Sequence, residues 1–470
     1  MRLFIPLVSL VIFGFAMAAD VDHATINRII DEGFNHSELP QTASYLMDRI
    51  GGRMTNSPQM RQAEKWTQEQ FRGYGLVNVH AEPFDFGRGW SIERAEARMV
   101  TPRVIVMHVI PVAWTPSTPG TISAGIVVAP MRRESDFAKW KGQLKGKVVL
   151  VDRPSDGSEP DKPPFRRLTD EEIGKLDAYQ QPAHSEKQIA KRLKRGNFEA
   201  KRDAFLAAEG ALAWMRQSYR DGGLLHGEGS GYRVGQTPKL AGIEVAAEDY
   251  RRLTRLAKSG VTPTVELTSV VRYHDEDHNA YNIIGEIPGR DPKAGYVMIG
   301  AHLDSWVAAD GASDNGAGSV AVLEAARILS KLSVKPKRTL RFALWAGEEQ
   351  GLLGSMAYVE RYLAERPPVA DPEQAKLSPY ATWFTRWPIK PKPGSESLAA
   401  YFNLDNGSGK IRGIYTEGNV AVTSIFREWL APFVSMGATR VVSEPTGGTD
   451  HVLMQSVGIP AFQFIQDPLD

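Results

Sequence analysis

The chain has 470 residues, enough for two or three domains, and 42% of them are hydrophobic, as is ordinary for a globular protein. Its formal net charge is +1, so charge gives no reason to expect nucleic acid or an anionic membrane as a partner. Cysteine is absent. The chain therefore forms no disulfide, and any metal site must use nitrogen and oxygen ligands.

The first residues are typical of a secretory signal peptide. Arg2 precedes an apolar segment, residues 3–15, and Ala16-Met17-Ala18 offers a cleavage site with small residues. The apolar segment is shorter than the roughly 20 residues that a membrane span needs, and no longer one follows. We therefore expect residues 1–18 to be removed near Ala18 and the mature protein to be secreted or periplasmic.

Three regions of different pattern follow along the chain. From residue 22 to about residue 86 the pattern is amphipathic and helical. Short β-branched strands, glycine-rich turns and one or two helices fill residues 115–272. After Pro288, apolar strands alternate with amphipathic helices, which is typical of an α/β domain with a largely parallel sheet. The strands are expected at 295–304, 339–346, 399–405 and 459–466, and the helices at 315–332 and 350–365.

These patterns predict an α/β fold with a mostly parallel, mixed sheet flanked by helices and an inserted β-rich domain. Residues 19–114 and 273–470 are expected to form the two parts of the main domain, and residues 115–272 the insertion. A proline-rich segment, residues 366–397, interrupts the second part. Its "WFTRWP" run either lines a cleft or packs beneath the segment.

Charged side chains gather where the predicted strands end. His302 and Asp304 end one strand, Asp314 precedes the next helix, and the pair Glu348-Glu349 and Asp405 end two further strands. Ligand sites in open α/β sheets lie beyond the carboxyl ends of the strands, so these side chains are expected to converge. One imidazole with several carboxylates suits Zn²⁺ or a related divalent ion. A free glutamate beside a metal would serve as a general base.

Four separated motifs carry a resemblance to a known family. The motifs "HLDSW…GASDNGAG", "LWAGEEQGLLGS", "NLDNG" and "GGTDHVLMQSVGIPAFQF" resemble, in order and spacing, the co-catalytic di-zinc aminopeptidases. Within that family the chain is most similar to the plasma glutamate carboxypeptidase branch. The middle segment resembles the protease-associated domain that many members carry. The resemblance implies a zinc exopeptidase fold with a peptide or dipeptide as substrate, and a homodimer is possible.

The resemblance also implies a role for each charged residue. His302 and Asp405 would bind one zinc ion, Asp314 would bridge two ions, and Glu349 would bind the second. Glu348 would be the base that deprotonates a metal-activated water. Asp304 would orient the imidazole of His302 from behind. Asp310 matches no role and is interpreted as a solvated loop residue.

One ligand of the resemblance has no counterpart. In the family a final histidine completes the second zinc site shortly after the strand that matches "GIPAFQFIQD". His451 is the one histidine after His302, but it belongs to a part of the pattern without a ligand, so we disfavour it as one. We expect a C-terminal truncation, a weaker second zinc site and an uncertain activity for the chain as written.

Alternatives from other classes stay open. A receptor-like relative without catalysis would have lost the metal ligands, which this chain keeps. An acyltransferase of the glutaminyl cyclase type would use one zinc and is not expected to keep the inserted domain. Recognition of a free amine or of a free carboxylate also stays open. His274 and His278 lie four residues apart, but their polar surroundings indicate a turn and not a metal site.

Overall fold

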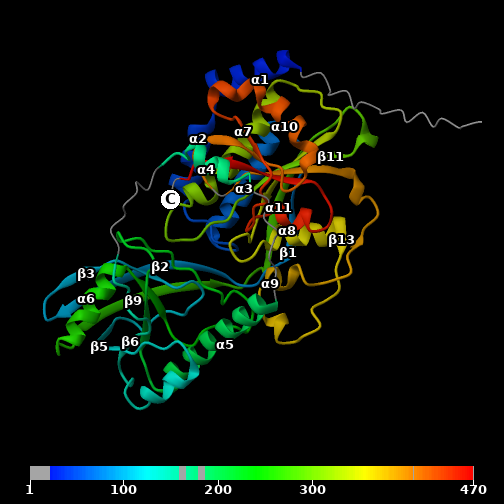
Figure 1. Cartoon of the computed structure of the whole chain (residues 1–470). Coiled ribbons are helices and arrows are strands. Elements are labelled where there is room, and N and C mark those ends of the chain that lie inside the picture. Colours follow the sequence, from blue (N-terminus) through cyan, green and yellow to red (C-terminus); the bar gives the residue numbers. More distant parts are fainter. Residues whose placement is uncertain (1–21, 158–165, 178–185, 406, 469–470) are drawn as a thin grey trace, which may run out of the picture.

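Two eight-stranded sheets organise the chain. The structure, a computed structural model, describes residues 22–157, 166–177, 186–405 and 407–468, so the predicted signal peptide lies outside the described residues. Each sheet forms its own body together with the helices that cover it, and the two bodies lie one above the other in Figure 1. None of the described helices is both long and apolar enough to cross a membrane.

The first sheet is mixed, with a parallel centre. Its strand order is β1-β10-β12-β11-β15-β18-β16-β17, and β12, β11, β15 and β18 run parallel to one another. The predicted mostly parallel sheet is therefore confirmed. Its strands are β1 (Val77–Asp85), β10 (Asn279–Ile287), β11 (Tyr296–His302), β12 (Thr339–Trp345), β15 (Leu398–Asn403), β16 (Ile411–Tyr415), β17 (Arg440–Val442) and β18 (Ala461–Gln466).

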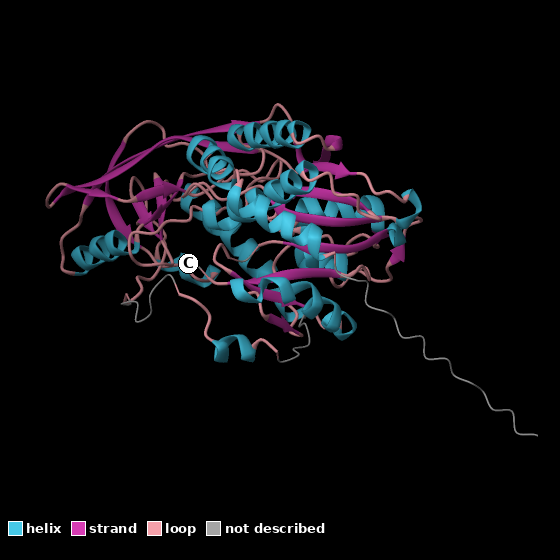
Figure 2. Cartoon of the chain, turned by 90° about the horizontal axis from the view of Figure 1, so that it is seen from above, coloured by secondary structure: helices cyan, strands magenta, loops and turns pink. Residues whose placement is uncertain are grey.

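Helices cover both faces of this sheet (Figure 2). Alternate residues of β12 point to opposite faces, as the period of two in a strand requires. Phe342 and Leu344 pack into the core beneath α3 and α7, whereas Ala343 and Trp345 pack into the core beneath α8 and α11. On the first face lie α1 (His23–Asn35), α2 (Leu39–Ser44), α3 (Pro58–Gly73) and α7 (Ala317–Lys331); on the second lie α8 (Leu353–Tyr358) and α11 (His451–Gln455).

The prediction of helix as far as residue 86 was wrong for its last part. Helix α3 ends at Gly73, and Gly75 has a positive φ of 85° that turns the chain. Residues 77–85 then form β1, an edge strand antiparallel to β10. An edge strand mixes polar and apolar residues because one of its sides faces solvent, and this mixture resembles the pattern of a surface helix.

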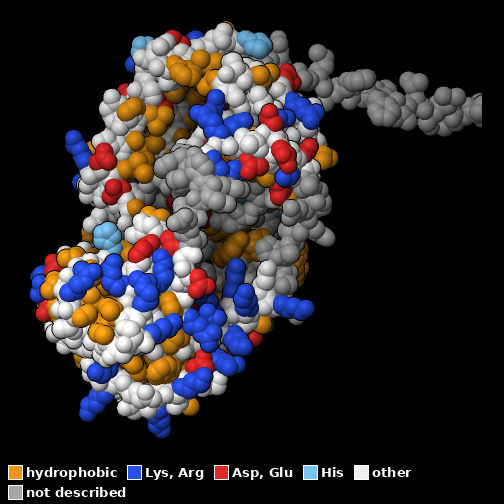
Figure 3. Space-filling model, turned by 60° about the vertical axis from the view of Figure 1, so that its left-hand side comes forward, with side chains coloured by type: hydrophobic (Ala, Val, Ile, Leu, Met, Phe, Trp, Pro, Cys, Tyr) orange, Lys and Arg blue, Asp and Glu red, His pale blue; other side chains and the backbone are white. Residues whose placement is uncertain are grey.

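The second sheet has the strand order β3-β2-β9-β5-β6-β7-β8-β4. Helices α5 (Glu186–Ala208) and α6 (Ala247–Lys258) pack on it. In Figure 3 this body, the lower of the two, carries many Lys and Arg side chains. Its strands are β2 (Gly89–Thr101), β3 (Ile105–Met107), β4 (Val109–Pro111), β5 (Ile122–Val128), β6 (Val148–Leu150), β7 (Ala213–Gln217), β8 (Gly242–Val245) and β9 (Thr264–His274).

The second sheet begins earlier in the chain than the predicted insertion at residue 115. Strand β2 pairs with β9 over nearly its whole length, and β3 and β4 follow it into the same sheet. A strand shows its local pattern in the sequence but not its partner, which is why this pairing escaped prediction. The domain division stays a prediction, and strand pairing would place its first boundary near residue 88.

A short helix ties the second body back to the first sheet. Helix α4 (Asp170–Lys175) lies in the chain between β6 and α5, yet its buried Ile173 packs against Val442 and Ile465 of the first sheet. Arg440 forms a salt bridge with Asp170 at 2.7 Å. Contacts of α4 therefore join this part of the chain to the first sheet.

Helix α3 buries one carboxyl group that has few partners. The Glu64 side chain is about 6% exposed; its Oε2 atom accepts a hydrogen bond from Arg61 at 3.0 Å, and its Oε1 atom has no partner. Burial raises the pKa of Glu64 to about 7, although Arg61 opposes the shift. The folded state therefore binds this proton more tightly than the unfolded state does.

We predict that Glu64 makes the protein less stable as the pH rises. The stabilisation is complete below the ordinary pKa near 4.5 and is lost as the pH passes the folded value near 7. Glu64→Gln cannot titrate, so the free energy of unfolding of the wild type should fall by about 2 kcal/mol relative to this variant between pH 4.5 and 7.5. Denaturant unfolding at both pH values measures the difference. Glu69→Gln, on the exposed side of α3, is the control, and equal pH profiles for wild type and Glu64→Gln would contradict the prediction.

Candidate metal centre

Three neighbouring parallel strands bring the predicted site residues together. His302 is the last residue of β11, the pair Glu348-Glu349 follows β12, and Asp405 follows β15. Asp314 lies in a single turn, η4 (Ala312–Gly316), just before α7. Because β12, β11 and β15 are adjacent and parallel, their carboxyl ends lie at one edge of the sheet.

His302 is the centre of this group. Its Nε2 atom lies 3.1 Å from Asp314 Oδ1, 3.5 Å from Asp405 Oδ1 and 3.9 Å from Glu348 Oε2. The imidazole is fully buried, yet Nε2 makes no hydrogen bond. The side chain of Asp314 is 67% exposed, so the group is open to solvent on that side. Catalytic zinc sites keep such an open position.

The other nitrogen of the imidazole sets its orientation. His302 Nδ1 lies 3.0 Å from the backbone oxygen of Asp304 and 3.6 Å from its Oδ1 atom. When Nδ1 donates its proton to this carbonyl, Nε2 keeps its lone pair and points it at the carboxylates. This is the tautomer that a histidine ligand needs.

Asp304 also holds the turn that carries the glutamate pair. Its carboxylate is completely buried and accepts hydrogen bonds from the backbone nitrogens of Glu348 at 3.2 Å and Glu349 at 3.3 Å. The hydroxyl of Thr55 lies 3.1 Å from the same carboxylate. The structure thus places Asp304 next to His302, and its role in orienting the imidazole stays a prediction.

Arg53 was not singled out from the sequence, which places it in the "GGR" run at residues 51–53. The structure buries Arg53 completely. Its guanidinium donates hydrogen bonds of 2.8–2.9 Å to four backbone carbonyls, those of Gly51, Leu303, Asp310 and Gly311. Burial lowers the pKa of Arg53 to about 10, against the opposing charge of Asp304. Arg53 therefore fixes the loop between His302 and Asp314, and the exposed Asp310 contributes its backbone oxygen.

The site is rich in carboxyl groups and poor in cations. Burial raises the pKa of Glu348 and of Glu349 well above the ordinary range, and raises that of Asp450 to about 7. Burial would lower the pKa of His302, but Asp405 and Glu348 outweigh it and raise that pKa well above the ordinary value. A divalent cation would supply the positive charge that this group lacks.

The donor set fits zinc. Potential ligand atoms of His302, Asp314 and Asp405 all lie within 4.8 Å of one another, and within the described ranges no other group of three such side chains does so. Glu349 lies in the turn after β12, and the charge of Asp314 adds to burial in raising its pKa. One buried nitrogen with carboxylate oxygens is a common zinc environment.

His451 lies outside this group. Its Nε2 atom is 3.2 Å from Glu417 Oε1 and 3.1 Å from Thr446 Oγ1, and the side chain is completely buried. Its neighbour Asp450 is also completely buried, accepts a hydrogen bond from Ser355 at 2.5 Å, and was not singled out from the sequence. Asp450 is the acidic residue of the "GGTDH" motif, and its place in that motif was the sequence signal by which it could have been predicted.

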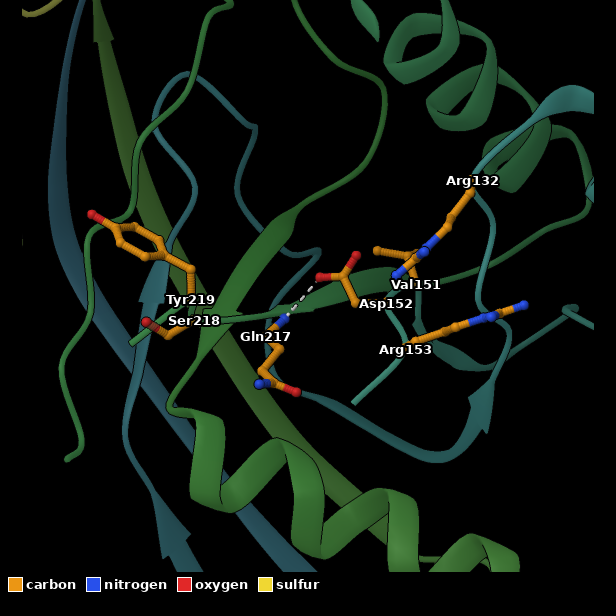
Figure 4. A pocket seen from close by; sticks show the side chains of 7 residues that line it. All are labelled: Arg132, Val151, Asp152, Arg153, Gln217, Ser218 and Tyr219. Carbon is orange, nitrogen blue, oxygen red and sulfur yellow. Dashed lines mark hydrogen bonds between the residues drawn. The ribbon is translucent and has the colours of Figure 1, made fainter. Parts of the chain in front are cut away.

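A polar hollow of about 210 Å³ lies in the other body (Figure 4). It follows the carboxyl ends of β6 and β7, and the carboxylate of Asp152 accepts a hydrogen bond from the backbone nitrogen of Gln217 at 3.0 Å. None of the predicted site residues lines it, so it is separate from the metal centre. It is lined by Arg132, Val151, Asp152, Arg153, Gln217, Ser218 and Tyr219.

Solved structures share the fold of this chain. A peptidase M28 precursor from Shewanella amazonensis superposes with a TM-score of 0.63 at 22% identity, over 95% of this chain and 88% of its own. BSAP, a zinc aminopeptidase from Bacillus subtilis, superposes with a TM-score of 0.54 at 20% identity, over 92% and 84% of the two chains. The predicted zinc exopeptidase type of fold is confirmed.

Sequence comparisons find similar peptidases. Carboxypeptidase Q from Bos taurus is 30% identical over 347 residues, which are 73% of this chain but only 65% of the cow protein. The human protein of that name is 25% identical over 96% of this chain and 82% of its own length. Residues 282–470, which hold every predicted metal-binding residue, match the profile described as Peptidase family M28. The resemblance that the motifs predicted is therefore confirmed, and this segment of the chain matches peptidase family M28.

Proposed function

We propose that the protein is a secreted or periplasmic, zinc-dependent exopeptidase that hydrolyses a peptide bond near a chain terminus. The observation that carries the proposal is the orphaned Nε2 atom of a fully buried His302, which points at carboxylates that are open to solvent on one side. The family of the chain and the zinc aminopeptidase named among the solved structures support zinc as the metal. The N-terminal sequence supports export.

The residues divide into ligands and a base. His302, Asp314 and Asp405 would hold one zinc ion, and Asp314 with Glu349 would hold a second. Zinc, when bound, would polarise the scissile carbonyl and lower the pKa of a water molecule. Glu348 is not needed as a ligand in this scheme, and its carboxylate stands 3.9 Å from the imidazole. It would take the proton from the attacking water and return it to the nitrogen of the leaving amine, so that water is consumed and two termini are released.

The surroundings of Glu348 suit this role. Its backbone nitrogen donates to Asp304, so the turn that carries it is held in place, and its carboxylate lies on the side of the His302 imidazole. Burial keeps water from solvating its carboxylate, which strengthens it as a base near the metals. Asp304 would keep His302 in the tautomer that binds metal.

We predict that Glu348→Gln abolishes turnover without loss of metal. The amide keeps the size of the side chain but cannot accept the proton, so kcat should fall by about 10²–10⁴-fold while zinc content and thermal stability stay near wild type. Hydrolysis of short unblocked peptides and elemental analysis of the same preparations measure both. Glu360→Gln, a half-exposed glutamate on the neighbouring helix, is the control. Full activity in Glu348→Gln would contradict the proposed base.

A further prediction compares His302 with His451. His302→Gln should lower bound zinc to a small fraction of the wild-type amount, whereas His451→Gln should keep the zinc of the first site. Zinc should raise the melting temperature of the wild type and of His451→Gln, and have little effect on His302→Gln, because a ligand that binds the folded state stabilises it. Calorimetry with and without a chelator measures the shift. Loss of zinc in His451→Gln alone would show that the ligand was misassigned.

A further inference from the structure

The polar hollow of the second body lies where α/β sheets bind their ligands. Strands β5, β6, β7 and β8 are parallel neighbours. Arg132 lies in the segment after β5, Asp152 and Arg153 follow β6, and Tyr219 follows β7, so the hollow opens beyond the carboxyl ends of three strands. Its volume of about 210 Å³ is below the roughly 300–1,000 Å³ of sites for drug-sized molecules, so we expect a small ligand.

Asp152 presents a fixed carboxylate to the hollow. Its backbone nitrogen donates a hydrogen bond to the hydroxyl of the fully buried Tyr250 at 2.8 Å, and that hydroxyl donates to the backbone oxygen of Asp152 at 3.0 Å. The carboxylate accepts one hydrogen bond from the described residues, that of the Gln217 backbone nitrogen on Oδ2. A carboxylate can accept about four, so it keeps capacity for a ligand.

Arg132 presents a positive charge to the same hollow. Its backbone nitrogen donates to Asp136 at 3.0 Å, whereas its guanidinium forms no hydrogen bond or ion pair with any described residue. In Figure 4 its side chain points toward Asp152, and that of Arg153 points away. Burial raises the pKa of Asp152, and the guanidinium groups near it, Arg132 among them, oppose the shift. Opposite charges therefore face one hollow without pairing with each other.

The walls of the hollow are also held in place. The side chain of Gln217 accepts a hydrogen bond from the backbone nitrogen of Ser155 at 3.1 Å and donates one to its hydroxyl at 2.5 Å. The ring of Tyr219 stacks on His226, with ring centres 4.1 Å apart. A site whose walls are already ordered loses little conformational entropy when a ligand binds.

The two charges together select a class of ligand. A simple anion beside Arg132 would be repelled by Asp152, and a simple cation beside Asp152 would be repelled by Arg132. A molecule that carries both charges satisfies both groups. An α-ammonium offers three donors to a carboxylate, and an α-carboxylate can accept two parallel hydrogen bonds from a guanidinium.

We infer that this hollow is a binding site for a zwitterion, a free α-amino acid or a short unblocked peptide. The ammonium group of the ligand would lie against Asp152 and its carboxylate against Arg132. The inference goes beyond the proposed function and does not depend on it, because none of the residues of the metal centre lines the hollow. Molecules of this class are also what an exopeptidase releases, so the second body would bind a product of the first.

The test is calorimetric titration of the zinc-loaded full chain with L-alanine. N-acetyl-L-alanine lacks the ammonium group and L-alaninamide lacks the carboxylate, so each leaves one charge of the hollow unpaired. We expect both to bind about tenfold or more weakly than L-alanine. L-alanyl-L-alanine, titrated into Glu348→Gln so that it is not hydrolysed, shows whether the amino acid or the peptide is preferred. Equal binding of the free and blocked forms, or no binding of either zwitterion, would overturn the inference.

Variants assign the binding to the hollow. Asp152→Asn keeps an acceptor for the Gln217 nitrogen, and Arg132→Gln removes a side chain without described partners, so both should fold. Each should weaken the binding of L-alanine by about tenfold or more. Glu93→Gln and Arg103→Gln remove the same charges from exposed positions of the same body and should bind as the wild type does.

His302→Gln separates this inference from the proposed function. Binding of L-alanine that persists in His302→Gln but is lost in Asp152→Asn and Arg132→Gln would support the inference, even if the wild type hydrolyses no peptide. Binding that is lost in His302→Gln and kept in both variants of the hollow would place the amino acid at the metal centre. That result would overturn the inference and leave the peptidase proposal intact.

Discussion

The buried carboxylate of Asp304 is the interaction on which the site depends. It is inaccessible to solvent, and it joins the end of β11 to the turn after β12 through the backbone nitrogens of Glu348 and Glu349. A buried charge is costly unless hydrogen bonds replace its hydration, and here N–H groups and the hydroxyl of Thr55 do so. Because the backbone oxygen of the same residue lies 3.0 Å from His302 Nδ1, Asp304 contacts both the imidazole and the turn that carries the proposed base. One residue thus links two elements of the site, through its backbone on one side and its carboxylate on the other.

Around this residue the fold concentrates charge that would destabilise an ordinary core. Acidic groups crowd one imidazole, and burial raises the pKa of Glu348 and Glu349 well above the ordinary range. Clusters with such perturbed groups are typical of functional sites, where stability is given up for chemistry. The first sheet tolerates the cost because its apolar cores on both faces are continuous up to the strand ends, as the complete burial of Phe342 and Trp345 illustrates.

The sequence was most informative about the site residues that lie at the ends of predicted strands. The alternation of apolar strands and helices after residue 288 predicted the parallel centre of the sheet, and adjacency of parallel strands then implied that His302 and Asp405 would meet. Arg53 and Thr55 were not predicted as site residues. Their partners are backbone atoms and a carboxylate some 250 positions away, and local sequence patterns carry no information on such contacts. The hydrogen bonds next to Asp405 could not be predicted for the same reason. Tyr401, Asn403 and Gln463 form a buried side-chain network across β15 and β18. Such networks depend on register, which a single sequence does not reveal.

The segment 366–397 is held in place by the packing of one tryptophan. Its Trp383 is completely buried, lies under the guanidinium groups of Arg366 at 4.5 Å and Arg386 at 4.9 Å, and donates a hydrogen bond to Ser456 at 2.7 Å. Of the two interpretations of its aromatic run, packing therefore describes Trp383. Yet this packing is what presents Tyr380, three residues earlier, to the turn of the glutamate pair on one side and to α5 on the other. Packing of the segment and contact with the glutamate turn are therefore not alternatives, because the buried anchor at Trp383 also fixes the position of Tyr380 next to Gly351.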